Sequence, residues 1–347
     1  MVIIMSNESG SFAPFNQTNQ TDTFGQMMYA RTELASGFTL AILSPITVAT
    51  NLLLITAIFK DPLKYFKKPT SHFVLGLSVA DLLCGLLVEP FFAMYYFCRY
   101  FRAGAEFQAI SQSLFLVGSI ISTASLNASF MMVLMLSVVQ VIAIECPYRY
   151  KTWVKKKTVI SCVVITWVYF TIFSLLPVLG VDQFVFFKIN LTLHATLISI
   201  VLALVQVMMY RAFRGRLQHQ NIINRLPSSS NSHDDSQQRS GAKKHLVKKQ
   251  NRCRLFDRNF IIMTFYLAAI LLFAAFPHIG VFYVFLYRKT GSLEEELSLN
   301  ILLRISDLLL FMKVAADAFI FAWRLPTYRK SLDFLITGKI PELETGV

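Results

Sequence analysis

Ionisable residues interrupt several apolar segments, and their types and spacing indicate what chemistry this chain could do. Lys313 and Asp317 stand four apart in the apolar run from Leu299 to Trp323, and Asp81 stands in another apolar run. Residues four apart lie on one face of a helix, so Lys313 and Asp317 can form an ion pair. Each charge inside a membrane costs at least a few kcal/mol, and an unpaired buried carboxylate takes up a proton instead. The pattern therefore indicates mutual charge neutralisation within a membrane-spanning bundle.

Composition favours a polytopic membrane protein. The 347 residues are 55% hydrophobic and 15% charged, and Phe alone contributes 31 of them. Such a chain is too apolar for a soluble domain of this length. We find no metal-ligand cluster, nucleophile elbow or phosphate-binding loop, so neither an enzyme nor a bound cofactor is expected. No separate basic domain indicates a nucleic-acid partner.

Seven segments have the roughly 20 mostly apolar residues that a membrane span needs. They are Phe38–Phe59, His72–Phe97, Phe107–Ile144, Thr158–Val181, Ile189–Tyr210, Phe260–Tyr287 and Leu297–Trp323. The third is long enough to be tilted or to extend into the cytosol. The expected fold is all-α: a seven-transmembrane helix bundle over 38–323, followed within 324–347 by a short amphipathic eighth helix on the cytosolic side, from Thr327 to Leu335.

The distribution of basic residues predicts the orientation. Of the 33 Lys and Arg residues, 25 fall in four segments, namely 60–71, 145–157, 211–258 and the part from 324 onward. Because basic loops stay cytosolic, the amino terminus is expected outside, the carboxyl terminus inside, and the protein at the plasma membrane with basic segments near anionic membrane lipids. Sequons at Asn7, Asn16 and Asn19 predict a glycosylated extracellular tail over 1–37. A polar, Ser-rich stretch predicts a disordered cytosolic loop over about 214–256.

Motifs in most of these spans follow a known pattern. They are Asn51, Leu77-Ser78-Val79-Ala80-Asp81, Trp167, Pro177, Pro277 and the block 317–332. This set resembles the rhodopsin-like (class A) G-protein-coupled receptors over all seven spans. The missing third-span cysteine and the short second outer loop are also similar to melanocortin and lipid receptors, and the run 148–152 is similar to melanocortin and adenosine receptors. The resemblance implies an extracellular ligand, a heterotrimeric G protein and, as a further candidate partner, arrestin.

The chain departs from that family at its cytoplasmic motif. Val139-Gln140-Val141 stands where the family has Asp-Arg-Tyr, whose arginine meets the G protein and pairs with an acidic residue of the sixth helix. The resemblance places the coupling surface at Gln140, Pro147, Tyr148 and Asp257. Since Gln140 is neutral, it cannot form a charged lock with Asp257. Two interpretations stay open: coupling through other contacts, or weak or absent coupling.

The resemblance also bears on the buried polar residues. Asp81, Ser125 and Ser129 resemble the family's sodium pocket, and Asn51 is a polar residue that can bond between helices. We hypothesise that the Lys313 ammonium lies between Asp81 and Asp317 as a built-in cation, which would reduce the benefit of binding sodium. The alternative is that Lys313 points toward lipid.

The resemblance places the ligand pocket between the outer halves of spans two, three, six and seven. The candidate lining residues are Glu89, Ser122, His278, Phe282, Arg304 and Asp307. The two acids could attract a cationic amine or basic peptide, and a lipid is equally compatible. Arg304 and Asp307, three apart, can instead pair with each other, and a lone His278 can be a packed core residue.

The sequence therefore predicts a cell-surface receptor that senses an extracellular ligand and signals through heterotrimeric G proteins. A receptor-like protein with weak or no coupling, acting as a decoy or heteromer partner, is the alternative that Gln140 motivates. A transporter or channel is less favoured because we detect no inverted repeat.

Overall fold

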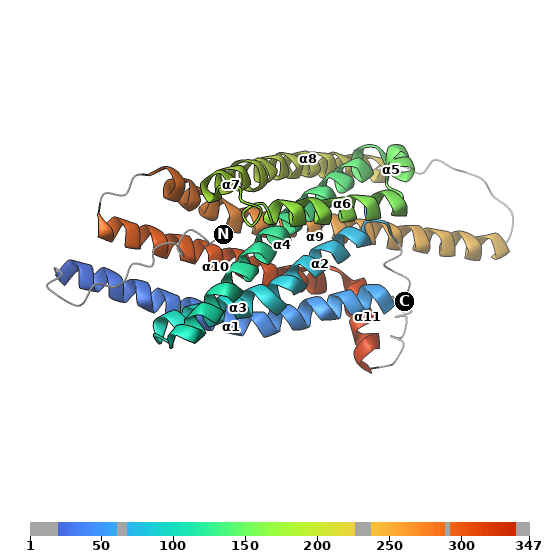
Figure 1. Ribbon diagram of the computed structural model, residues 1–347. Coiled ribbons are helices and arrows are strands. Elements are labelled where there is room, and N and C mark those ends of the chain that lie inside the picture. The colour runs from blue at the N-terminus through green and yellow to red at the C-terminus, as the bar shows by residue number, and fades with distance from the viewer. Residues whose placement is uncertain (1–19, 61–67, 226–236, 289–291, 338–347) are drawn as a thin grey trace.

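Seven long helical segments form the computed structural model, which describes residues 20–60, 68–225, 237–288 and 292–337 (Figure 1). They are α1 (Gln20–Lys60); α2 (Ser71–Leu83), η2 (Cys84–Val88) and α3 (Glu89–Tyr100) in succession; α4 (Ala105–Glu145); α6 (Lys156–Ser174); α7 (Gln183–Ile189), η3 (Asn190–Leu197) and α8 (Ile198–Arg225) in succession; α9 (Gln237–Tyr287); and α10 (Leu293–Arg324). The short helices α5 (Pro147–Trp153) and α11 (Pro326–Thr337) complete the set. The predicted all-α bundle with an eighth helix is confirmed.

Two of the seven segments contain a π-helical turn. The segment η2 directly precedes α3, which carries Pro90 in its first turn. Proline lacks the N–H that an α-helix uses there, so a local widening of the helix accommodates it. The second, η3, interrupts the helix formed by α7 and α8, and it contributes Asn190 and His194 to the buried interior. Such π-helical turns often mark functional sites because they rotate side chains out of the regular α-helical register.

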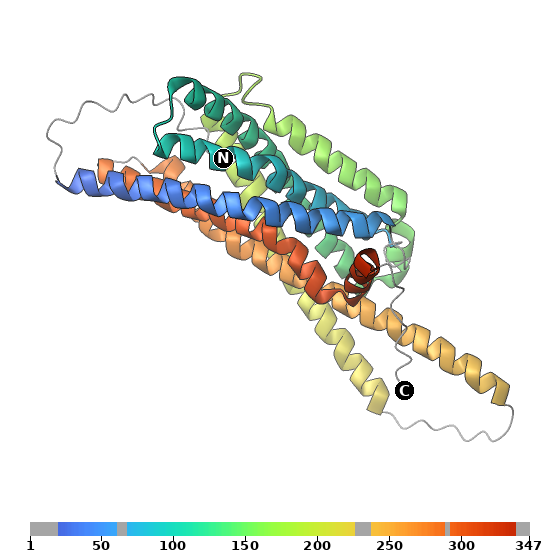
Figure 2. The ribbon, with the colours of Figure 1, turned by 90° about the horizontal axis from the view of Figure 1, so that it is seen from below.

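Six of the described helical segments have the length and hydropathy to cross a membrane. The seventh segment, α10, has 32 residues and carries Arg304, Asp307, Lys313 and Asp317 along its length. It packs against α1 and α9 along the bundle, so its charged residues lie within the protein (Figure 2). These charged residues lower the mean hydropathy of α10, but α10 still packs as the seventh helical segment of the bundle.

Several predicted boundaries need correction. Helix α1 begins at Gln20, so the second half of the predicted tail 1–37 is helical, while Asn7, Asn16 and Asn19 lie outside the described residues. The predicted fourth span to Val181 ends as a helix at Ser174, because the residue before Pro177 is disfavoured in helical geometry.

Parts of the predicted disordered loop over about 214–256 are helical. Helix α8 continues to Arg225 and α9 starts at Gln237, and both project beyond the other helices (Figure 2). The Gln, Arg and Lys residues of these extensions are good helix formers, so polarity alone did not indicate disorder. Residues 226–236 lie outside the described part of the chain.

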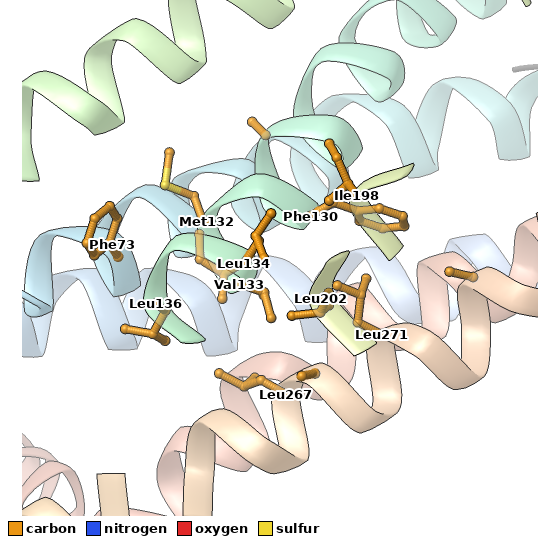
Figure 3. Close-up of a cluster of buried hydrophobic side chains, with 14 of the residues drawn as sticks. Phe73, Phe130, Met132, Val133, Leu134, Leu136, Ile198, Leu202, Leu267 and Leu271 are labelled. Atoms are coloured by element: carbon orange, nitrogen blue, oxygen red, sulfur yellow. The ribbon is translucent and has the colours of Figure 1, made fainter. Parts of the chain in front are cut away.

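Helix α4 lies at the centre of the main apolar core. Its residues Phe130, Met132, Val133, Leu134 and Leu136 are buried. The facing residues are Phe73 of α2, Ile198 and Leu202 of α8, and Leu267 and Leu271 of α9 (Figure 3). Because α4 has buried residues along most of its length, a polar group on it is held at a fixed depth in the bundle.

The contact between α1 and η2 is close enough to require glycine at position 85. A Cβ atom on Gly85 would lie 2.8 Å from both Cβ and Cγ2 of Thr47, and Ser44 Oγ donates a hydrogen bond to Gly85 O at 2.8 Å. We expect Gly85→Ala to destabilise the bundle by about 1–3 kcal/mol, because the β-branched Thr47 has little freedom to move. The measurement is thermal unfolding in detergent.

Gly280→Ala in α9 is the matched control, since no atom lies within 4 Å of a Cβ there. It should leave stability unchanged or raise it by up to about 1 kcal/mol through helix propensity. Equal midpoints for the two variants would contradict the close-packing argument.

Candidate functional site

A fully buried ion pair occupies the middle of α10. Lys313 Nζ lies 2.6 Å from Asp317 Oδ2, and it donates a hydrogen bond to Ser129 Oγ of α4, also at 2.6 Å. All three residues are at most 1% exposed. The structure thus directs Lys313 inward, as the hypothesis of an internal pair required, and the alternative of a lipid-facing lysine is wrong.

Asp81 does not share the ammonium in the way we hypothesised. Neither Asp81 carboxylate oxygen has a hydrogen-bond donor, and no ion pair within 4 Å joins it to Lys313 among the described residues. The ammonium has instead its one-turn neighbour Asp317 and the hydroxyl of Ser129 as close partners. Asp81 still interacts electrostatically with Lys313 and with Asp317. The cluster therefore contains two carboxyl groups and one lysine, with only one carboxylate directly paired.

The remaining predicted polar residues are buried on neighbouring helices. Asn51 is buried on α1, but its amide Nδ2 donates to Thr47 O within the same helix at 3.0 Å rather than across helices. Ser125 is buried on α4, one turn from Ser129, and its Oγ has no hydrogen-bond partner. The buried centre therefore has more hydrogen-bonding capacity than it uses.

A cavity lies next to this centre, between α4, η3, α9 and α10. It is a small cavity that is partly open to its surroundings. The lining residues are Ser122, Thr123, Leu126, Asn127, Phe130, Asn190, Ala195, Ala275, His278, Ile279 and Leu310. Two of the predicted ligand-binding residues, Ser122 and His278, are among them.

Two further predicted residues hold His278 in place. Asp307 Oδ1 lies 3.2 Å from His278 Nδ1, and Ser306 Oγ lies 3.1 Å from the same nitrogen. The ring of Phe282 stacks on His278 with centroids 5.8 Å apart. Asp307 thus pairs across helices with His278, whereas the sequence suggested a pair with Arg304.

The last two predicted ligand-binding residues lie away from the cavity. Arg304 donates from Nη1 to Tyr96 OH and sits over that ring at 4.3 Å from the centroid. Glu89 is fully buried, and Thr47 Oγ1 donates to its Oε1 at 3.4 Å. Arg304 thus contacts α3 and Glu89 contacts α1, and neither residue lines the cavity. Their role in ligand binding stays a prediction.

Comparison with known proteins agrees with this geometry. The family model for the 7 transmembrane receptor (rhodopsin family) matches residues 50–320. The chain belongs to the rhodopsin family of seven-transmembrane receptors. Histamine H2 receptors of Homo sapiens, Pongo pygmaeus and Gorilla gorilla gorilla are each 32% identical to this receptor over 129 residues. That alignment covers 37% of this chain and 33% of each relative, so the similarity spans about a third of their length.

The predicted coupling residues of this rhodopsin-family receptor lie at one end of the bundle. Gln140 is buried near the end of α4, Pro147 starts α5, and Tyr148 is exposed. Asp257 lies on α9, but its side chain is outside the described set.

An apolar cluster lies at the same end of the receptor. It consists of Val141 and Ile144 of α4, Met209 of α8 and Ile261 of α9, and we name it the inner apolar cluster. One turn away from it, Gln206 Nε2 of α8 donates to Ser137 Oγ of α4 at 2.8 Å. These contacts hold α4, α8 and α9 together.

Sequence reasoning missed the two asparagines of the cavity. Asn127 Nδ2 donates to Asn190 Oδ1 at 2.8 Å, which joins α4 to η3. Each is a lone amide within a predicted apolar span, which is the kind of signal that singled out Asn51. Their pairing could not be foreseen because Asn190 belongs to the π-helical segment η3.

Proposed function

We propose that the protein is a plasma-membrane receptor that binds an extracellular ligand in the cavity and activates heterotrimeric G proteins. Its amino terminus is outside and its carboxyl terminus cytosolic, as the distribution of Lys and Arg favours. Membership in the rhodopsin family of receptors and a cavity between the helices of the bundle support this proposal.

One observation carries the mechanism: α4 and α10 contribute to both the cavity and the buried ion pair. Phe130 lines the cavity, and its neighbour Ser129 binds Lys313. Leu310 also lines the cavity, and it precedes Lys313 by three residues, about 4.5 Å along the helix. A ligand that displaces α4 relative to α10 must therefore disturb the Lys313–Ser129 contact. Such differential contacts are what a ligand needs to shift a two-state equilibrium.

A receptor-like protein without coupling is the second candidate, and Gln140 favours it. The family position for the G-protein-contacting arginine holds a buried neutral amide here. The protein would then bind ligand and act as a decoy or heteromer partner.

Basal G-protein activation in transfected cells separates the two candidates. We expect the native receptor, at matched surface expression, to activate at least one Gα class above mock-transfected cells. The variant Val139→Asp, Gln140→Arg, Val141→Tyr serves as the positive control for coupling. Activity in the variant together with none in the native receptor would establish the second candidate instead.

A further inference from the structure

The described lining of the cavity contains no Asp, Glu, Lys or Arg side chain. Among its described lining residues only His278 is titratable, and the acid nearest to it, Asp307, lies behind that ring at 3.2 Å rather than in the lining. The other ionised groups close to the cavity, Lys313 and Asp317, are paired with each other at 2.6 Å. An ammonium that entered would lose its water without gaining a carboxylate partner in the lining, which is unfavourable.

Two amides in the lining offer complementary hydrogen-bonding groups. The bond from Asn127 Nδ2 to Asn190 Oδ1 uses one donor and one acceptor of the pair, and His194 Nδ1 lies 3.4 Å from the same oxygen. No hydrogen bond among the described residues uses Asn127 Oδ1 or Asn190 Nδ2. Neither atom is among the fully buried polar atoms without a partner, so each keeps some accessible surface. Both atoms are therefore accessible from the cavity, one as an acceptor and the other as a donor.

The geometry around the amide pair is held from three helices. His194 Nε2 lies 2.9 Å from Tyr169 OH of α6, and the His194 ring packs edge-on against Phe173 at 4.3 Å. These contacts fix η3 and thereby Asn190. A preorganised donor and acceptor bind a matching edge without an ordering cost.

The rest of the wall is apolar. It consists of Leu126, Phe130, Ala195, Ala275, Ile279 and Leu310. Small pockets of this kind take a compact apolar or aromatic body and orient it with a few polar contacts.

We propose that the cavity binds an uncharged ligand that presents an amide-like edge, with a donor and an acceptor side by side, to Asn127 and Asn190, on a small apolar or aromatic body. The proposal rests on the assignment of this cavity as the ligand site of the receptor. It excludes an ammonium-bearing amine as the preferred occupant.

The test uses two probes of similar shape, benzamide and benzylamine, with the full-length receptor purified in nanodiscs. Ligand-observed NMR measures their binding. We expect benzamide to bind and benzylamine to bind at least tenfold more weakly, and Asn127→Leu to weaken benzamide at least tenfold because the amide edge is lost. Benzylamine binding equal to or tighter than benzamide would overturn the proposal, as would binding of neither probe.

Two further variants guard against a fold defect in Asn127→Leu. Ala195→Leu fills the cavity and keeps the amide pair, and it should also abolish benzamide binding. Asn300→Leu replaces a buried asparagine of α10 outside the lining, and it should bind benzamide like the native receptor. Unchanged benzamide binding in Ala195→Leu would show that the probe binds elsewhere and would refute the assignment.

Failure of this proposal and failure of the proposed function are distinguishable. Basal G-protein activation of the native receptor requires no ligand, so signalling with the wrong probe selectivity overturns only the ligand class. Benzamide binding without any signalling overturns only the coupling.

Discussion

Replacing Lys313 by alanine should lower the free energy of unfolding by about 3–5 kcal/mol, the cost typical of removing one member of a buried pair. Asp317 would then be fully buried beside Asp81 with no cation between the α10 and α2 carboxyl groups. Surface expression should fall with stability. Thermal unfolding of purified receptor and surface labelling in cells measure the two effects.

The double variant Lys313→Met, Asp317→Leu is the informative companion. It removes both charges and keeps similar apolar volume, a replacement that is often neutral or stabilising for buried pairs. We expect it to recover most of the stability lost in Lys313→Ala. Lys188→Ala is the matched control, because Lys188 contacts the rings of Phe184 and Tyr287 near the end of the bundle and lies outside the ion cluster.

The effect of sodium on stability is a second measurement that compares the native receptor with Lys313→Ala. Lys313 compensates Asp317 directly, so the native receptor should gain little stability when sodium replaces a bulky organic cation at constant ionic strength. Lys313→Ala leaves two carboxyl groups and the Ser129 and Ser125 hydroxyls as oxygen ligands, and sodium should stabilise it. Equal stabilisation of both proteins would refute the built-in cation.

Local spacing explains why the Lys313–Asp317 pair was predictable and its relation to Asp81 was not. Residues four apart on one helix must be neighbours, whatever the rest of the chain does. Asp81 belongs to α2, and its distance from Lys313 depends on how far each helix is rotated in the bundle, which no sequence spacing encodes. Ser129 occupies a coordination position of the ammonium that we had assigned to Asp81.

The cavity also contains residues that the sequence could place and residues that it could not. Ser122 and His278, which the family resemblance placed in the ligand pocket, line the cavity, and their role in ligand binding stays a prediction. Arg304 and Glu89 lie outside the lining because their helices present them to Tyr96 and Thr47 instead. Asn190 escaped notice because the π-helical turn rotates it out of the register that a regular helix predicts.

Met209→Ala should raise basal G-protein activation, because we expect the inner apolar cluster to keep the G-protein-coupling end of the receptor closed. Met209 is 1% exposed and packs with Val141, Ile144 and Ile261 from α4 and α9. Truncating a buried methionine costs at least about 2 kcal/mol of packing. If these contacts exist only while α4, α8 and α9 are together, that loss shifts the open-to-closed ratio about thirtyfold. Activation is measured per receptor at the cell surface.

The neighbouring Met208→Ala is the control, since Met208 is half exposed on α8 and is not a member of the buried cluster. It should signal like the native receptor. The two variants are best compared in the Gln140→Arg background. There the family's arginine is present, so weak coupling by the native Gln140 cannot hide a difference in basal activation. Equal signalling of Met208→Ala and Met209→Ala in that background would mean that the cluster only packs the helices.

A closed state held by uncharged side chains explains how a chain with Gln140 in place of the arginine can still have a resting state. Its strength would be set by apolar packing, so opening would require no charged pair to break.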